Sequence, residues 1–402
     1  MKAPRLPVSH PLAATVNRSL SALQNLHPDN SQLKQLNASQ LMGERAFLNN
    51  TKFRSGISAG GYCRIIYCKD QAVAVNLPRD IDWELIAPWL QVSDVKPGNW
   101  HVIYSELQKK HSSEVVERAR LIGLAVSPTE TNVAEYTLTP QTPKRLNFEN
   151  DQKPTVLDLS SLWAGPLCSH LLAICGAKVI KLESLSRPDG ARLGNKEFYN
   201  LLNQGKQSVA VDLPTSQGRQ ILKRLIDHAD IVIESSRPRA MEQMGINPEK
   251  LVAQREYLTW VSITGYGRKE PNRNWIAYGD DAGVAAGMTK LMRLATGHYE
   301  FAGDAIADPI TGIHGALLVW QNWLQQKGGL ISLSLRDVTL AIMKQELRQR
   351  GITETINSFS EWWLQAQSNN PHQGIIKRPI LSKAEDLGSS NERVGRIFKI
   401  AC

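Results

Sequence analysis

From residue 155 onward, short apolar runs alternate with longer segments whose apolar residues recur every three or four positions. The short runs are five or six residues long and rich in β-branched residues, which is typical of buried strands. They cover 155–159, 178–183, 208–212, 230–234, 258–263 and 330–335. Helical patterns between and after them cover 165–176, 214–228, 248–255, 309–326, 337–350 and 361–364. Such alternation indicates parallel strands joined by right-handed crossovers. The sequence therefore predicts a Rossmann-like, doubly wound, mostly parallel α/β sheet, which binds ligands at the carboxyl ends of its strands.

The chain before residue 150 follows a different pattern. Two alternating runs, 62–67 and 72–75, predict a β-hairpin. Helical patterns follow at 82–90, at 100–110, and from a capping Ser113 to about Gly123. We expect a smaller α+β domain here, preceded by a polar segment, residues 1–50, that is partly helical or loose.

Prolines and polar residues crowd residues 139–154, as in a linker. We place a domain boundary near residue 150, which gives a small domain over 1–150 and a Rossmann-like domain over 151–402. The tail beyond Ser368 shows no clear period and is expected to be irregular.

Composition places the chain among ordinary globular proteins, with 402 residues, 42% hydrophobic and 21% charged. No window is long and apolar enough to span a bilayer, and the N-terminal residues lack the apolar core of a secretion signal. The five cysteines, an odd number, show no zinc spacing and argue against a disulfide framework. These features predict a cytoplasmic protein with neither a membrane partner nor a metal.

The formal net charge of +9 suits nucleic acid or a small polyanion such as a nucleotide or coenzyme A. The basic residues are scattered, and no nucleic-acid-binding signature accompanies them. The loop after the first strand, residues 160–166, is not a Gly-x-Gly-x-x-Gly fingerprint, and there is no P-loop. Nicotinamide chemistry and nucleoside-triphosphate hydrolysis are therefore disfavoured.

One carboxylate lies where a helix N-terminus is expected, a position that suits a reactive group. Asp308 precedes Pro309, and proline is favoured at the first position of a helix. We therefore expect Asp308 to be the N-cap of a helix over 309–326, where the macrodipole and free N–H groups keep it ionised. An ionised carboxylate in that position can act as a nucleophile; the alternative is that it only caps the helix.

A series of segments, in order, resembles the class III CoA-transferases of the CaiB/BaiF type. They span about 156–337 and end near the family's nucleophile motif, which matches Ile306 to Gly312. The matching segments are 156–166, 176–183, 203–213, 229–238, 244–245, 262–267, 278–288 and 306–312. Residues 58–62 and 114–126 are similar to small-domain segments that usually follow this part of the family. Their position here indicates a permuted order, which is tolerated when the joined ends lie close at the surface.

The resemblance implies an acyl-CoA:carboxylate CoA-transferase with a coenzyme A thioester as substrate, a carboxylic acid as acceptor and no tightly bound cofactor. It assigns Asp308 as the nucleophile that forms an aspartyl anhydride and an aspartyl-CoA intermediate. It also implies a homodimer. Gly60 and Gly61 match the family's glycine loop and are candidates for stabilising an oxyanion, although an ordinary tight turn before the hairpin fits them equally.

The resemblance places coenzyme A over the loop that contains Trp163, Ala164 and Gly165. Candidates for its phosphates are Arg192, Lys206 and Arg237, each of which has the alternative of a solvated charge. Ser235 replaces a residue that often touches coenzyme A in the family, and Trp163 has the alternative of a core position.

Two positions bear on which reaction is expected. Tyr278 lies where related racemases carry a proton-transferring histidine, and a phenol is a poor base at neutral pH. We expect Tyr278 to line the pocket or to fill core. Gly279 replaces the acid that usually follows this position. The alternatives to a transferase are an acyl-CoA racemase or isomerase on the same fold, and a non-catalytic acyl-CoA-binding homologue.

Overall fold

A six-stranded sheet organises the larger part of the chain in this computed structural model, which describes residues 9–93, 95–130 and 153–399. The strand order is β6-β5-β4-β7-β8-β9, and every pairing between these strands is parallel. The strands are β4 (Thr155–Asp158), β5 (Lys178–Ser184), β6 (Gln207–Val211), β7 (Ile231–Glu234), β8 (Thr259–Thr264) and β9 (Gly329–Ser334). All six correspond to predicted strands, so the expected parallel α/β sheet is confirmed.

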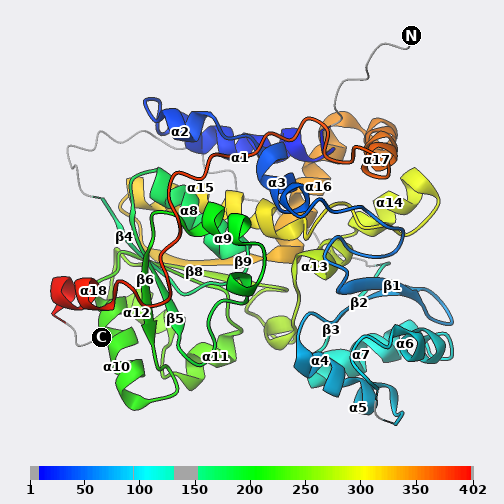
Figure 1. Cartoon of the computed structure of the whole chain (residues 1–402), viewed down its shortest axis with the longest axis horizontal. Helices are drawn as coiled ribbons and strands as arrows, with labels where there is room; N and C mark the ends of the chain where they lie inside the picture. Colours follow the sequence, from blue (N-terminus) through cyan, green and yellow to red (C-terminus); the bar gives the residue numbers. More distant parts are fainter. Residues whose placement is uncertain (1–8, 94, 131–152, 400–402) are drawn as a thin grey trace.

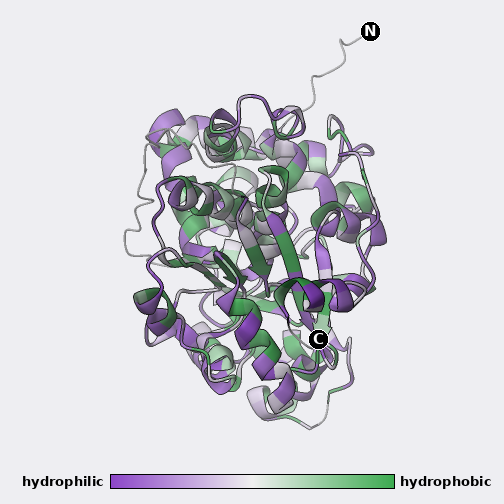
Figure 2. Cartoon of the chain, turned by 90° about the vertical axis from the view of Figure 1, so that its left-hand side faces the viewer, coloured by the Kyte–Doolittle hydropathy of each residue, from purple (hydrophilic) through white to green (hydrophobic). Residues whose placement is uncertain are grey.

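Side chains alternate between two faces of this sheet, and each face has its own layer of helices. On β4, Val156 belongs to one apolar cluster and Leu157 to the other, as period-two alternation requires. The first face is covered by α8 (Ala164–Ile174) and α15 (Ala307–Leu324), and the second by α10 (Ser216–Asp227), α11 (Pro238–Gln243) and α12 (Pro248–Gln254). Figure 2 shows apolar strands inside and polar residues outward on the flanking helices.

The chain leaves β4 towards β5 and β6 on one side, then crosses back to β7, β8 and β9 on the other. The switch point of the winding therefore lies between the carboxyl ends of β4 and β7, where open α/β sheets bind ligands. The remaining helices of this unit are α9 (Lys196–Asn203), α13 (Gly279–Ala285), α14 (Met288–Thr296), α16 (Leu335–Arg350), α17 (Ile352–Ala366) and α18 (Asn391–Phe398), with single 3-10 turns at Gly190–Leu193 and Asn272–Asn274.

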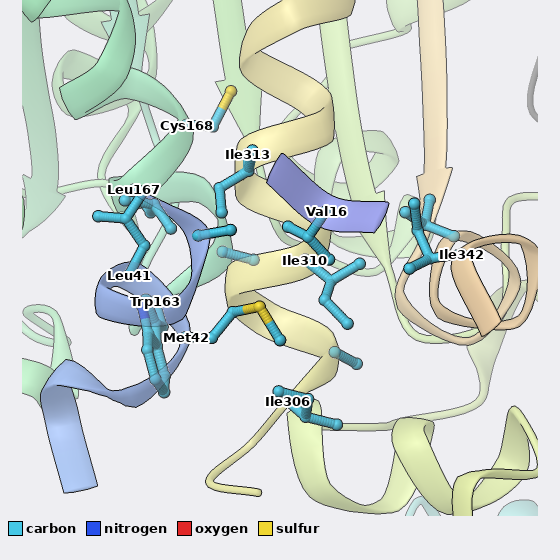
Figure 3. Packing of buried hydrophobic residues seen from close by; sticks show 14 of the residues in the cluster. Val16, Leu41, Met42, Trp163, Leu167, Cys168, Ile306, Ile310, Ile313 and Ile342 are labelled. Atoms are coloured by element: carbon cyan, nitrogen blue, oxygen red, sulfur yellow. The ribbon is translucent and has the colours of Figure 1, made fainter. Parts of the chain in front are cut away.

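Helix α15 forms the centre of the first face. Figure 3 shows Ile306, Ile310 and Ile313 along it, with Trp163 on one side and Ile342 on the other. Gly312 permits this close packing, because a Cβ there would lie 2.6 Å from the carbonyl oxygen of Ala164 at the start of α8. The start of α15 and the start of α8 are thereby held together.

The smaller unit has its own core. Strands β1 (Cys63–Tyr67), β2 (Ala72–Asn76) and β3 (Ala125–Pro128) form an antiparallel sheet, which confirms the hairpin and the α+β class. Its helices are α4 (Asp80–Glu84), α5 (Ile86–Leu90), α6 (Trp100–Leu107) and α7 (Ser112–Ile122). The predicted cap at Ser113 is wrong: α7 begins at Ser112, whose N–H and hydroxyl both bind the Asp70 carboxylate at 2.8 Å.

Of the two alternatives expected before residue 50, partly helical or loose, the described residues show the helical one. Three helices form, α1 (Ala13–Asn25), α2 (Ser31–Lys34) and α3 (Ala38–Leu48), and they lie along α8 and α15 in Figure 1. Leu12, Val16, Leu20 and Leu23 recur at helical spacing and are buried in the same core as α15. Residues 12–48 thus pack into the larger unit, while the predicted boundary near 150 lies outside the described residues.

The C-terminal segment crosses the sheet edge before it ends in α18. Asn391 brackets the backbone of Ala210 on β6, accepting from its N–H at 2.9 Å and donating to its carbonyl at 2.8 Å. Glu385 accepts from the N–H of Ser208 at 2.8 Å. This cover protects an edge strand whose backbone groups would otherwise be unpaired. Helix α18 itself was not predicted.

Candidate active site

Asp308 lies near the start of α15, but it is not the N-cap. The N-cap is Ile306, whose backbone is already helical, so the helix begins at Ala307, two residues earlier than Pro309 suggests. Asp308 is the second helical residue, and its N–H donates to the carbonyl of Ala305 at 2.9 Å. Its side chain is half-buried, at the end of α15 that faces the smaller unit.

Four carboxylates gather around this point: Asp280 and Asp281 from the start of α13, Asp304 from the preceding loop, and Asp308. Burial raises the pKa of Asp308 to about 7, and the charges of Asp280, Asp304 and Asp281 add to the increase. The pKa of Asp280 rises to about 6 and that of Asp281 to about 7, again chiefly through burial. Asp308 is therefore only partly ionised at neutral pH, rather than held fully ionised by the helix terminus as expected, because burial and then the neighbouring acids raise its pKa.

Arg45 is the cation that faces this group. Its Nε donates to Asp304 Oδ2 at 2.8 Å and its Nη2 donates to Asp304 Oδ1. Its guanidinium stacks over the ring of Trp163, with the carbon 4.7 Å from the ring centroid. Arg45 comes from α3, in the segment that was expected to be partly helical or loose, and no motif singled it out.

Gly279 explains how the carboxyl of Asp308 approaches α13 so closely. A Cβ at this position would lie 2.5 Å from Asp308 Oδ2 and 2.4 Å from the carbonyl oxygen of Ala305. The absence of the usual acid here thus makes room for the Asp308 side chain. The next residue, Asp280, accepts from the N–H of Ala305 at 2.9 Å and fixes the loop that leads to Asp308.

The loop with Gly60 and Gly61 forms a tight turn before β1. Gly61 has a φ of 79° and donates its N–H to the carbonyl of Ser58 at 2.9 Å. The hydroxyl of Ser58 bonds to Asp280 and helps to lower its pKa. The turn is therefore tied to the acidic group, while the N–H of Gly61 already has a partner within the turn.

The loop after β4 divides into buried and exposed parts. Trp163 is completely buried against Phe198 and Arg45, so its side chain is core and offers no surface to a ligand. Ala164 is also buried, and a Cβ at Gly165 would lie 2.1 Å from the hydroxyl of Ser160. The exposed residues of this loop are Ser161 and Leu162.

Lys206 and Arg192 are engaged inside the protein, contrary to the phosphate-binding prediction. Lys206 is buried, and its Nζ donates to Asp158 Oδ2 at 3.0 Å, to the carbonyl of Pro166 at 2.9 Å and to Ser169 at 2.7 Å. Arg192 forms a fork with the carboxylate of Glu183. In this structure the buried acids Asp158 on β4 and Glu183 on β5 bind these two cations, which leaves Arg237 as the exposed candidate.

Ser235 and Arg237 lie at the switch point of the sheet. The hydroxyl of Ser235 accepts from the N–H of Ser161 at 3.1 Å, so the loops after β4 and β7 touch. Arg237 is exposed; partial burial lowers its pKa, and so do the charges of three other arginines. These are Arg239, Arg79 and Arg187. We call these four side chains the arginine cluster; it joins residues that follow β5 and β7 with one from the smaller unit.

Tyr278 connects the arginine cluster to the acidic group. Burial raises its pKa to about 12; the charges of Arg79 and Arg187 oppose this increase, and those of Asp82 and Asp281 add to it. Its N–H donates to Asp281 Oδ1 at 2.9 Å. A phenol with this pKa does not serve as a base at neutral pH.

A cavity of about 100 Å³ lies on the far side of Asp304, between α3, α17 and residues 371–375. Its wall includes Asp304 and Ile306, which precede Asp308, and the rings of His10, Phe53, Trp362 and His372. Across the described ranges, no group of three or more His, Cys, Asp or Glu side chains is arranged to hold a metal ion. No helix in these ranges is both long enough and apolar enough to cross a membrane.

Comparison with known proteins identifies the family of the chain. The family model described as CoA-transferase family III matches residues 152–366. A succinyl-CoA–D-citramalate CoA-transferase of Chloroflexus aurantiacus is 28% identical over 49% of this chain and 52% of its own length. A formyl-CoA:oxalate CoA-transferase of Escherichia coli is 27% identical over 52% of each chain. The chain thus spans about half the length of these curated relatives.

Among solved structures, a CAIB/BAIF family protein from Brucella suis is 27% identical, with a TM-score of 0.42 over 50% of this chain and 56% of that one. The family match covers more than half of the 402 residues and contains both the switch point and Asp308. The chain belongs to CoA-transferase family III.

Proposed function

We propose that this protein is an acyl-CoA:carboxylate CoA-transferase in which Asp308 is the nucleophile. The observation that carries the proposal is the position of the Asp308 carboxyl, half-buried at the start of α15 and crowded by three other acids. A strongly perturbed, partly exposed carboxyl between two structural units is typical of a reactive site. With a pKa of about 7, a substantial fraction is ionised at neutral pH, and the carboxylate is more basic than an ordinary aspartate.

The reaction proceeds by exchange at this carboxyl. One Asp308 oxygen attacks the thioester carbonyl carbon, the carbon–sulfur bond breaks, and the CoA thiolate leaves with the electron pair. The mixed anhydride is then attacked by the thiolate at the aspartyl carbon, which releases the donor acid and gives aspartyl-CoA. The acceptor carboxylate repeats these steps in reverse order and leaves as the new thioester. Covalent catalysis thus divides one difficult transfer into easier ones.

The arginine cluster gives the proposed substrate an anchor. Coenzyme A carries a diphosphate and a 3′-phosphate, and Arg237 has arginines rather than carboxylates as its strongest charged neighbours. The cluster adjoins the switch point, where Ser161 and Leu162 are exposed. Tyr278 lies between this cluster and the four carboxylates near Asp308: the charges of two cluster arginines act on it, and its N–H binds Asp281. This arrangement supports phosphates at the cluster and the thioester at Asp308.

Two sets of measurements test the proposal. The protein is incubated with succinyl-CoA, acetyl-CoA or benzoyl-CoA plus hydroxylamine, and the peptide containing Asp308 is examined by mass spectrometry. A transferase gives an aspartyl hydroxamate at Asp308 in the wild type and none in Asp308→Asn. A racemase instead gives solvent deuterium at the α-carbon of a branched thioester without trapping, which contradicts the proposal. Coenzyme A binding with neither result indicates a non-catalytic homologue.

A further inference from the structure

Arg45 is fixed from two sides beside the proposed nucleophile. The carboxylate of Asp304 binds it through two nitrogens, and the ring of Trp163 covers one face of its guanidinium. Asp304 and Trp163 are both almost completely buried. A planar guanidinium that makes two hydrogen bonds to one carboxylate and stacks on an aromatic ring has little freedom to move. An ammonium group in the same place would make neither interaction in this way.

The charged surroundings make this position important. The groups whose charges act on Asp308 are Arg45 from α3, Asp280 and Asp281 from α13, and Asp304 from the preceding loop. Two further titratable groups face these acids: the thiol of Cys63 on β1 beside Asp281 and Asp280, and the imidazole of His372 near Asp304. Of the four groups that act on Asp308, Arg45 is the one cation. Its charge lowers the pKa of Asp308, whereas the three acids raise it.

We propose that Arg45 is a positioning residue for Asp308: by neutralising Asp304 and holding a fixed positive charge, it keeps the nucleophile available as a carboxylate. This inference rests on the proposed function. The helix that carries Arg45 packs on α9 and α15 and lies in the N-terminal segment, outside the residues that match the family. The N-terminal segment therefore completes the site electrostatically, in addition to covering the core.

The two members of the pair act on Asp308 in opposite directions. Without Arg45, the nucleophile loses an attractive charge and faces an unpaired Asp304, so protonation becomes easier. Without the charge of Asp304, the Asp308 carboxylate loses one repulsive neighbour and keeps the attraction of Arg45, so its ionisation becomes easier. A purely structural pair predicts no such opposition, because breaking it from either side only loosens the fold.

The experiment measures the ionisation of Asp308 directly. Carbon-13 NMR titration of aspartate-labelled protein, with Asp308→Asn to assign the signal, is carried out on the wild type, Arg45→Met, Asp304→Asn and Arg45→Lys. We expect the midpoint to rise by about one pH unit in Arg45→Met and to fall by about one unit in Asp304→Asn. Arg45→Lys should lie between Arg45→Met and the wild type. This readout needs no catalytic turnover, so it stays informative if the proposed function fails.

Activity supplies the second readout. In the hydroxamate assay, Arg45→Met should lose about fivefold in rate at pH 7 and recover most of it at pH 9, because a one-unit rise from a pKa of about 7 lowers the ionised fraction of Asp308 at pH 7 by about that factor. Where Arg45→Met folds poorly, the double variant with Asp304→Asn removes both charges and avoids an unpaired buried acid.

Arg378→Met is a matched control, since Arg378 binds the neighbouring Glu44 of the same helix through two bonds of 2.6 Å. It should lower stability while leaving the pH profile unchanged. Equal shifts in the Arg45→Met and Asp304→Asn midpoints, or a shift in the control alone, would overturn the proposal.

Discussion

Two buried groups of charged side chains touch the start of α8, and they contrast in charge balance. In the first, Asp158 and Asp189 bind Lys206 and Lys181 at 3.0 and 2.9 Å, so two acids face two bases. In the second, Asp308 and the three acids around it face Arg45. Burial disfavours the charged form of the acids in both groups, so the charges of the neighbouring side chains determine whether each carboxyl is protonated.

The outcomes differ accordingly. The ammonium groups of Lys206 and Lys181 overcome the effect of burial and hold the pKa of Asp158 well below its usual range. In the second group, burial and like charges together raise the pKa of Asp308 to about 7. In the balanced group the carboxylate of Asp158 stays ionised, and burial instead lowers the pKa of Lys206 to about 8. The unbalanced group holds an acid that changes its state near neutral pH.

The largest effect that sharpens this contrast is expected from Gly279→Ala. The added Cβ would meet Asp308 Oδ2 and the carbonyl of Ala305, so the carboxyl must move. A displacement of about 1 Å at a nucleophile costs on the order of a hundredfold in rate. Hydroxamate formation should fall by that factor, while circular dichroism stays native. Gly194→Ala is the control, because its Cβ would make only an ordinary contact with Ala191; equal activity in the two variants would contradict the assignment.

Much of the framework was predictable because it depends on local periodicity. The six strands of the large sheet follow from runs such as Lys178–Ser184, whose buried faces leave a continuous apolar signal. Asp308 was found because Pro309 marks a helix start and the surrounding segments resemble a family. The irregular tail was only partly predicted, since α18 forms where β6 needs an edge partner.

The site chemistry was less predictable because it depends on contacts between distant segments. Arg45 lies 259 positions before Asp304 in the sequence, and its helix α3 is short, with polar as well as apolar residues buried. Lys206 was a candidate for a phosphate because it is a cation within a segment that resembles the family, whereas its ammonium group binds Asp158 inside the fold. The ionisation of Asp308 was misjudged for the same reason: the helix terminus is visible in the sequence, but the three converging acids are not.

Removing a base from the balanced group tests whether it is structural. Lys206→Met leaves Asp158 buried with Lys181 as its remaining base. Breaking a buried ion pair on one side costs roughly 3 kcal/mol or more of unfolding free energy. Urea denaturation should show this loss, while the pH midpoint of hydroxamate formation stays at the wild-type value. Lys383→Met, at an exposed pair with Asp386, should change stability by less than about 0.5 kcal/mol. If the pH midpoint of hydroxamate formation shifts in Lys206→Met, the balanced group affects the ionisation of Asp308 and is not purely structural.

A smaller effect is expected in the arginine cluster, away from both acidic groups. Arg237→Ala removes one charge-assisted contact to a phosphate, worth on the order of tenfold in affinity. Calorimetry should show about a tenfold higher Kd for coenzyme A and a weaker dependence on salt, with kcat unaffected. Arg396→Ala on α18, an exposed arginine remote from the cluster, is the control. If both variants bind coenzyme A like the wild type, the phosphates lie elsewhere.

The smallest effect is the pH dependence of the wild type itself. With a pKa of about 7, the ionised fraction of Asp308 falls about fivefold between pH 7 and pH 6, and the rate of hydroxamate formation should fall with it. Stability must change in the opposite direction. Because the folded pKa lies above the unfolded value, the stabilising contribution of Asp308 is complete below about pH 4 and is lost as the pH rises through 7. Asp308→Asn should therefore gain stability over the wild type at pH 8 and lose that advantage at pH 5, as thermal unfolding at both pH values can measure. A stability difference that is the same at both pH values would mean that Asp308 behaves like the balanced Asp158, with its charge already compensated.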